Sequence, residues 1–321
     1  MRTWLTDRFG LTVPVVAAPM AGVSTGALAA AVTGAGGLGT IAVGPATTPE
    51  RLREDSATAR AGGAFGVGLL AWALQDGGAA LVDAVVDQSP ALVSVSYGPY
   101  ARWVPTLQAA GIVVATQVGT LAEALAAQEA GVDLLVARGG EGGGHGRDDV
   151  ATLPLLQSVL DAVELPVLAA GGVGTARGLA AVLAAGAVGA WVGTAFLACS
   201  EAATSEAARQ RLVAADDTGT AYGRVFDVGQ RLDWPPEYGG RALRNAFSAR
   251  WAGREDLLAT DDGAASELRE ARARGDFDIA CIYAGQGVGL LRGERPASDV
   301  VAELARAGEL LDRAAGRSTH D

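Results

Sequence analysis

Short apolar runs recur about every twenty to twenty-five residues through roughly the first two hundred residues of the chain. The runs are continuous rather than alternating with polar residues, which is typical of parallel strands buried on both faces. We therefore expect eight buried strands, at Val13–Ala18, Leu38–Val43, Phe65–Leu70, Ala91–Ser96, Ile112–Thr116, Asp133–Ala137, Pro166–Ala170 and Gly189–Gly193.

Helical signals lie between these runs. Thr120 and Glu123 form a capping-box pattern ahead of an Ala- and Leu-rich stretch, and Gly131 marks its end. Thr48, followed by proline, and Thr175 open two further helices in the same way. Strands that alternate with helices indicate βα units, and eight such units favour an α/β fold of the (β/α)₈ barrel type over an open doubly wound sheet.

The alternation stops at about residue 200. We expect residues 1–200 to form the barrel, and the more polar residues 201–275 to form an appended, mostly helical subdomain near its mouth. Residues 276–321 should return to the barrel as an active-site segment and a C-terminal helix, which Ser298 caps and which ends near Ala314. Trp234, Tyr238 and Trp251 either form a partner-binding surface on the subdomain or pack against the barrel.

Composition narrows the class of protein. Half of the residues are hydrophobic and 19% are charged, which suits a large buried core. All 25 basic residues are arginine, so enzymes that need a lysine, such as Schiff-base enzymes and P-loop NTPases, are excluded. The net charge of −11 argues against a nucleic-acid partner. Cys199 and Cys281 lack the spacing of metal ligands, so we expect reduced thiols and no metal site.

Two long uncharged stretches, near residues 9–50 and 178–200, are interrupted by Gly, Pro, Ser or Thr. That pattern indicates buried strands and helices rather than segments that cross a membrane. Asp7 and Arg8 precede only a short apolar run, which does not match a signal peptide. We therefore expect a cytoplasmic protein that has no contact with a membrane.

In a (β/α)₈ barrel, functional residues gather at the carboxyl ends of the strands. The seventh and eighth predicted strands end in Gly171–Gly172 and Gly193–Thr194, and glycine loops at these two places commonly hold a phosphate group. The first strand ends in the small-residue turn Met20–Gly22, which either admits a flat ligand or is a plain tight turn. Together these ends predict a ligand that carries a phosphate.

His145 follows the sixth predicted strand inside a glycine-rich run, and the second histidine, His320, is next to last in the chain. Imidazole is the side chain that titrates near neutral pH without help, so His145 is the first candidate for proton chemistry. Surrounding glycines permit backbone conformations closed to other residues, which favours a ligand-facing His145 over a surface or core histidine. Glu141 either orients His145 or is an exposed loop residue.

These motifs resemble the nitronate monooxygenase family, formerly called 2-nitropropane dioxygenases, which are FMN-dependent (β/α)₈ barrels. The matching segments cover nearly the whole chain in order, at residues 17–39, 137–146, 166–197, 239–247 and 283–291. The resemblance implies that His145 is the catalytic base. It also implies an FMN site made of Met20, Ala21, Gly22, Gly143, Gly171, Gly172, Gly193 and Thr194, to which we add Arg138 as a further candidate.

The resemblance further implies oxidation of a nitronate or nitroalkane by O₂ to a carbonyl compound and nitrite. The alternative is an FMN-dependent reductase that uses NAD(P)H, like enoyl-acyl-carrier-protein reductases or NADH:quinone reductases. A non-catalytic flavin- or phosphate-binding barrel is a third, less favoured reading. The oligomeric state stays open, with a homo-oligomer among the options.

Two positions depart from the family. Gly68 stands where its members usually carry Asn, and Arg138 where they usually carry Gln. Arg138 either binds an anionic flavin or substrate through its guanidinium, or pairs with Glu141.

Overall fold

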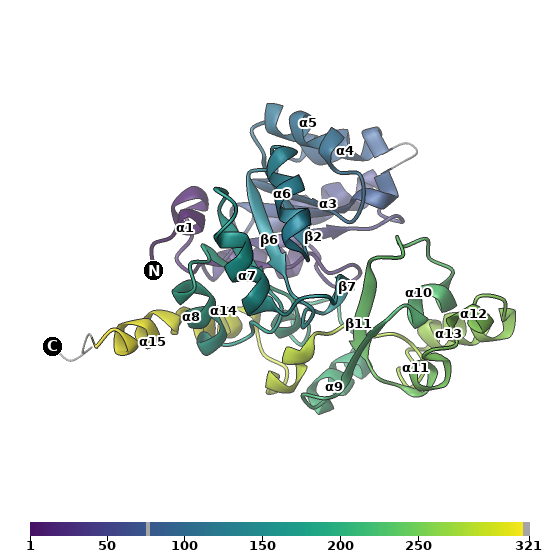
Figure 1. The fold of residues 1–321 in the computed structure, drawn as a ribbon. Helices are drawn as coiled ribbons and strands as arrows, with labels where there is room; N and C mark the ends of the chain where they lie inside the picture. The colour runs from purple at the N-terminus through teal and green to yellow at the C-terminus, as the bar shows by residue number, and fades with distance from the viewer. Residues whose placement is uncertain (75–77, 317–321) are drawn as a thin grey trace.

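The computed structural model describes residues 1–74 and 78–316, so His320 lies outside the described residues. Eight parallel strands form one sheet, in the order β1-β9-β8-β6-β5-β4-β3-β2. A parallel bridge between Val16 and Leu38 joins its two edges and closes the barrel. The predicted (β/α)₈ barrel is therefore confirmed, with its helices wrapped around the sheet (Figure 1). The strands are β1 Val15–Ala17, β2 Gly39–Val43, β3 Phe65–Leu70, β4 Leu92–Ser96, β5 Val113–Val118, β6 Leu134–Arg138, β8 Val167–Ala170 and β9 Gly189–Val192.

The barrel has an inner and an outer core, because its strands are buried on both faces. Inside, Leu38, Leu92, Leu134 and Leu168 pack together, and Leu5 from helix α1 joins them. Outside, the strands pack against the helices, as their continuous apolar runs require. The helices of this part are α1 Trp4–Phe9, α2 Gly26–Gly34, α3 Pro49–Arg60, α4 Gly78–Asp87, α5 Val104–Ala109, α6 Leu121–Glu129, α7 Thr152–Leu160 and α8 Ala176–Ala184.

Two of the helix-end predictions need correction. Thr120 does cap α6, since its hydroxyl accepts from the Glu123 N–H, but the Glu123 carboxylate does not close the box. That carboxylate instead accepts from the Gly119 N–H and from Arg147. The prediction that Ser298 caps a single final helix is also wrong. The chain forms α14 Ala297–Ala305 and α15 Ala307–Ala314, and the Ala297 N–H donates to the Glu201 carboxylate, so α14 starts before Ser298.

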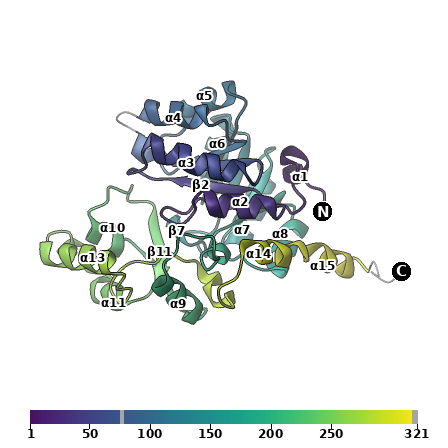
Figure 2. The ribbon, with the colours of Figure 1, turned by 180° about the vertical axis from the view of Figure 1, so that it is seen from behind.

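The appended region extends to one side of the barrel (Figures 1 and 2). It is mostly helical, but it also carries two strands that pair in an antiparallel sheet with β7 Gly144–Gly146 of the barrel's glycine loop. The sequence analysis missed this sheet. The elements are α9 Glu206–Ala214, β10 Thr220–Gly223, α10 Val225–Gln230, β11 Gly239–Leu243, α11 Ala246–Trp251, α12 Glu255–Leu258 and α13 Asp262–Arg274.

The aromatic residues of this region pack inside the molecule. Trp251 lies in a core with Phe247 and Leu268, and Trp234 contacts aromatic rings of the barrel. The Tyr238 hydroxyl hydrogen-bonds to Glu123 of α6. These three residues therefore pack against the rest of the molecule and do not form a partner-binding surface.

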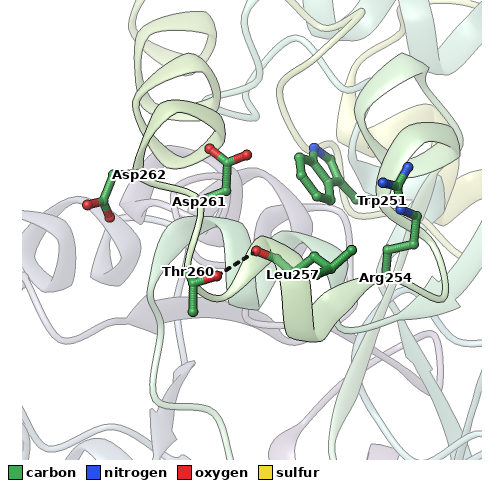
Figure 3. Close-up of a pocket in the computed structure, with 6 residues that line it drawn as sticks. All are labelled: Trp251, Arg254, Leu257, Thr260, Asp261 and Asp262. Atoms are coloured by element: carbon green, nitrogen blue, oxygen red, sulfur yellow. Dashed lines mark hydrogen bonds between the residues drawn. The ribbon is translucent and has the colours of Figure 1, made fainter.

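An open hollow of about 550 Å³ lies between α11 and α13 (Figure 3), lined by Trp251, Arg254, Leu257, Thr260, Asp261 and Asp262.

Within residues 1–74 and 78–316, no helix is long and apolar enough to cross a bilayer. In the same ranges, no cluster of His, Cys, Asp and Glu side chains has the makeup of a metal site.

Candidate active site

His145 is the middle residue of β7, and Gly240 of β11 is its antiparallel partner. A Cβ on Gly240 would lie 2.7 Å from the Tyr283 ring and 3.4 Å from His145 Nε2. Glycine at position 240 therefore leaves room for the imidazole and the phenol ring to approach each other. The loop that carries His145 is thus held by a sheet that the appended subdomain supplies.

Asp227 of α10 holds the imidazole. Its Oδ1 lies 2.7 Å from His145 Nε2 and also accepts from the Tyr283 hydroxyl at 3.1 Å. The Asp227 side chain is 1% exposed and the imidazole 9% exposed. An ionised carboxylate only accepts hydrogen bonds, so Nε2 carries the hydrogen in this pair. In the described part of the chain no hydrogen bond occupies Nδ1, so the lone pair of a neutral imidazole is available there.

Aromatic rings fix the plane of the imidazole. The Trp234 indole stacks on it, with ring centroids 3.5 Å apart and planes 4° apart, and the Tyr283 ring lies 5.0 Å away at 52°. Burial raises the pKa of Tyr283 well above its usual value, so its hydroxyl stays protonated and can donate to Asp227. Asp227, Tyr283 and Trp234 therefore restrict both the tautomer and the orientation of His145.

Tyr97 lies directly after β4, with its ring edge-on to Trp234 and its hydroxyl donating to the His145 carbonyl at 3.0 Å. Its φ of 68° is in the left-handed region, which is uncommon for a residue with a side chain. Burial raises the pKa of Tyr97 to about 12. Through this hydroxyl, a residue of the barrel holds the backbone of His145.

Arg138 ends β6 and is 4% exposed. Its guanidinium donates to carbonyl groups of the loop, including those of Gly144 at 3.0 Å and Arg147 at 2.7 Å. The ion pair with Glu141 is not formed, because the Glu141 carboxylate accepts from the N–H and hydroxyl of Thr152. Glu141 has no hydrogen bond to His145 either. A contact between Arg138 and a flavin stays a prediction.

The remaining predicted residues lie at the same end of the barrel. The Cβ position of Gly193 is 3.6 Å from the Met20 sulfur, so the turn after β1 adjoins the end of β9. Gly174, after β8, is likewise in contact distance of Ala195, after β9. Gly143 packs closely against the backbone of Gly285 in the C-terminal segment. The structure therefore brings the residues near these strand ends together, and their roles toward a cofactor remain predictions.

The loops after β8 and β9 fit the phosphate end of FMN. Gly171 and Gly172 have φ values of 108° and 70°, and a Cβ on Gly171 would lie 2.5 Å from the Thr152 hydroxyl. The Thr194 hydroxyl accepts from the Gly285 N–H at 2.9 Å, so its own hydrogen is available to an anion. A cavity of about 490 Å³ opens beside Gly172 of the loop after β8, and its lining also carries the side chains of Glu141, Asp216 and Asp217.

Gly68 has a direct structural explanation. A Cβ at this position would lie 2.2 Å from Cγ of Pro19, next to the turn that begins at Met20. An asparagine at position 68 would require Pro19 to move. Glycine at position 68 therefore allows Pro19 to take its present place, and with it the turn that follows β1.

The roles of Asp227, Tyr283 and Trp234 at this site were not predicted from the sequence. No local pattern marks Asp227, which lies 82 residues after His145. Tyr97 was missed too, although its position directly after a predicted strand was a signal that the analysis did not use.

This arrangement defines a (β/α)₈ barrel enzyme in which a carboxylate-held histidine lies at the carboxyl ends of the strands. A sequence profile of the family "Nitronate monooxygenase" matches residues 2–76 and 69–307, and the chain belongs to that family. It is 33% identical to a nitronate monooxygenase of Paraburkholderia phytofirmans over 94% of each chain.

Solved structures agree with the family assignment. FabK of Thermotoga maritima superposes with a TM-score of 0.85 at 27% identity, covering 99% of this chain and 100% of that one. A nitroalkane oxidase of Streptomyces ansochromogenes gives a TM-score of 0.78 at 31% identity, covering 96% and 99%. The chain is therefore an oxidoreductase of the nitronate monooxygenase type.

Proposed function

We propose that this protein binds FMN and oxidises nitroalkanes, taken up as such or as nitronates, with O₂ to a carbonyl compound and nitrite. The observation that carries the proposal is the His145–Asp227 pair, which leaves Nδ1 as an available base beside the strand ends. The residues proposed to hold the phosphate of FMN are Gly171, Gly172, Gly193 and Thr194. Those proposed for the rest of the flavin are Met20, Ala21, Gly22, Arg138 and Gly143.

FMN, when bound, supplies the redox chemistry. The protein's own part is to move one proton and to position the carbon that loses it. His145 Nδ1 takes the proton from the carbon that bears the nitro group, which leaves a nitronate and an imidazolium. The Asp227 carboxylate, bonded to Nε2–H, stabilises that imidazolium. The rings of Trp234 and Tyr283 keep the imidazole in its plane during the transfer.

The test compares His145→Ala with the unaltered enzyme on two substrates. A positioned general base contributes about 10²–10⁴-fold, so turnover of a neutral nitroalkane should fall by that factor. Turnover of the pre-formed nitronate, which has already lost the proton, should change far less. Equal losses on both substrates would rule out His145 as mainly a base. A purified protein that is colourless and cannot be reconstituted with FMN would reject the flavoenzyme proposal.

The likeness to FabK supports a second candidate, an FMN-dependent reductase that takes electrons from NADH or NADPH. Anaerobic mixing separates the two, because a reductase would lose its flavin colour with NADH or NADPH, whereas the favoured enzyme would keep it. We place the protein in the cytoplasm, which the two free thiols, Cys199 and Cys281, support.

A further inference from the structure

The loop that carries His145 has its carbonyl groups held by side chains. Arg138 donates to the carbonyls of Gly142, Gly143, Gly144 and Arg147. The Tyr97 hydroxyl donates to the carbonyl of His145 at 3.0 Å, and the Tyr222 hydroxyl to that of Gly146 at 2.9 Å. Every carbonyl from residue 142 to residue 147 therefore accepts from a side chain outside β7. We call Arg138, Tyr97 and Tyr222 the carbonyl clamp.

Arg138 is the centre of the clamp. Its guanidinium is buried, and within the described residues none of its hydrogen bonds goes to a carboxylate. A Cβ on Gly142 would lie 2.7 Å from Nε of Arg138, and a Cβ on Gly146 would lie 2.6 Å from Nη1. The loop thus wraps around the guanidinium, and two of its glycines are there to make space for it.

A smaller side chain would not replace this arrangement. A guanidinium presents five N–H donors in one plane, whereas a glutamine amide presents two and a lysine ammonium three on a flexible stem. Arg138 spans the carbonyls of residues on both sides of His145, which requires donors that diverge from one rigid plane. A glutamine amide, with its two N–H donors, would leave at least two of the four carbonyls that Arg138 holds without a side-chain donor.

We propose that Arg138 is a positioning residue, which fixes the backbone on both sides of His145 so that Nδ1 is aimed at the substrate carbon. Tyr97 and Tyr222 hold the two carbonyls that Arg138 does not reach. This role is additional to the proposed contact of Arg138 with the flavin, and it rests on the proposed function of His145 as the base. It also explains why a cation is buried where no carboxylate neutralises it directly.

The experiment uses the FMN-loaded protein with Arg138→Gln, Arg138→Lys and, as a matched control, Arg102→Gln. Arg102 also donates to a backbone carbonyl, that of Leu74, and stacks on Trp103, but it does not touch the loop. Two readouts are taken: hydrogen exchange of the amides of residues 139–147, and the ratio of turnover on a neutral nitroalkane to turnover on its nitronate. Misplacing a catalytic group by about 1 Å costs up to roughly 10²-fold.

We expect Arg138→Gln to speed amide exchange in residues 139–147, with α3 and α6 unchanged, and to lower the turnover ratio by about 10–100-fold. Arg138→Lys should give a similar loss, although it keeps the charge. Arg102→Gln should leave both readouts as they are. A turnover ratio unchanged in Arg138→Gln would overturn the proposal, and so would full activity in Arg138→Lys, because charge alone would then suffice.

If Arg138→Gln does not fold, Tyr97→Phe and Tyr222→Phe each remove one hydroxyl and keep the ring. Each should lower the turnover ratio in the same direction by a smaller factor, and no change in either would contradict the clamp. His145→Ala separates this proposal from the proposed function. If His145→Ala leaves the turnover ratio unchanged, the base assignment fails, while amide exchange in Arg138→Gln still tests whether Arg138 orders the loop.

Discussion

The barrel and the appended subdomain both reach His145, but they contribute different kinds of group. From the barrel come glycine loops, the Thr194 hydroxyl, and Arg138 and Tyr97, whose side chains bond to carbonyls of the His145 loop. The subdomain also holds that loop, through β11 and the Tyr222 hydroxyl. The subdomain supplies Asp227 and Trp234, which hold the imidazole ring itself. Cofactor retention should therefore depend mainly on the barrel, and proton transfer mainly on the subdomain.

The largest expected effect comes from Asp227→Asn. An amide can donate to Nε2, which would move the imidazole hydrogen to Nδ1 and remove the base from its proposed place. We expect turnover of a neutral nitroalkane to fall by about 10²-fold or more. FMN content, read from the visible spectrum, should stay at the level of the unaltered protein. Loss of FMN together with activity would contradict the division between barrel and subdomain.

A matched pair of core variants sharpens the same comparison. Leu168→Ala lies inside the barrel and Leu268→Ala inside the subdomain, where Leu268 packs near Gly229 of α10. Each truncation of a buried leucine should lower the free energy of unfolding by about 2–5 kcal/mol, measured by urea denaturation. Only Leu268→Ala should also lower the turnover ratio of nitroalkane to nitronate, because it disturbs the helix that carries Asp227. An equal turnover ratio of nitroalkane to nitronate in the two variants would contradict the assignment of proton transfer to the subdomain.

Gly68→Asn tests the barrel side. The new side chain must displace Pro19, so we expect a loss of about 1–3 kcal/mol in stability and weaker retention of FMN on dilution. Gly44→Ala is the control, since a Cβ at position 44 meets no atom within 4 Å. Unchanged FMN retention in Gly68→Asn would mean that the turn at Met20 does not depend on the fit of Pro19 against Gly68.

The smallest expected effect concerns Tyr97, where the two regions meet. Burial raises its pKa to about 12, so the folded protein keeps the phenol proton above the pH at which the unfolded chain loses it, near 10. The stability that this group contributes is complete below about pH 10 and is lost as the pH rises to about 12. In Tyr97→Phe, the urea concentration at the midpoint of unfolding should therefore fall less steeply as the pH rises from about 10 to about 12. A fall of unchanged steepness would show that Tyr97 does not titrate in this way.

The barrel could be predicted from the sequence because its strands are continuous apolar runs and several of its helices, such as α3, α6 and α8, carry local end signals. The strand-end glycines and His145 could be predicted as site residues because they follow the predicted strands. Errors arose where a distant residue replaced a local one. Glu123 bonds to Arg147 rather than closing its capping box, and Glu201 caps the helix that Ser298 was expected to start.

The subdomain's part of the site could not be predicted for the same reason. Asp227 reaches His145 from α10, which lies between β10 and β11, and β11 pairs with a glycine loop that has no strand-like pattern. A run of Gly-His-Gly offers no alternation of polar and apolar side chains, so nothing in that run predicts its pairing with β11. Arg138, too, contacts backbone carbonyls, which leave no trace in the sequence.

The pairing of β7 with β11 also sets an order of events during synthesis. All eight barrel strands and their glycine loops leave the ribosome before Asp227 does, and His145 emerges 82 residues ahead of it. At synthesis rates of about 5–20 residues per second, that interval lasts several seconds. During this interval the strand-end glycines and His145 have been synthesised, but Asp227, which orients the imidazole, has not. The reactive centre is therefore completed late in translation, when most of the chain that must protect it from solvent already exists.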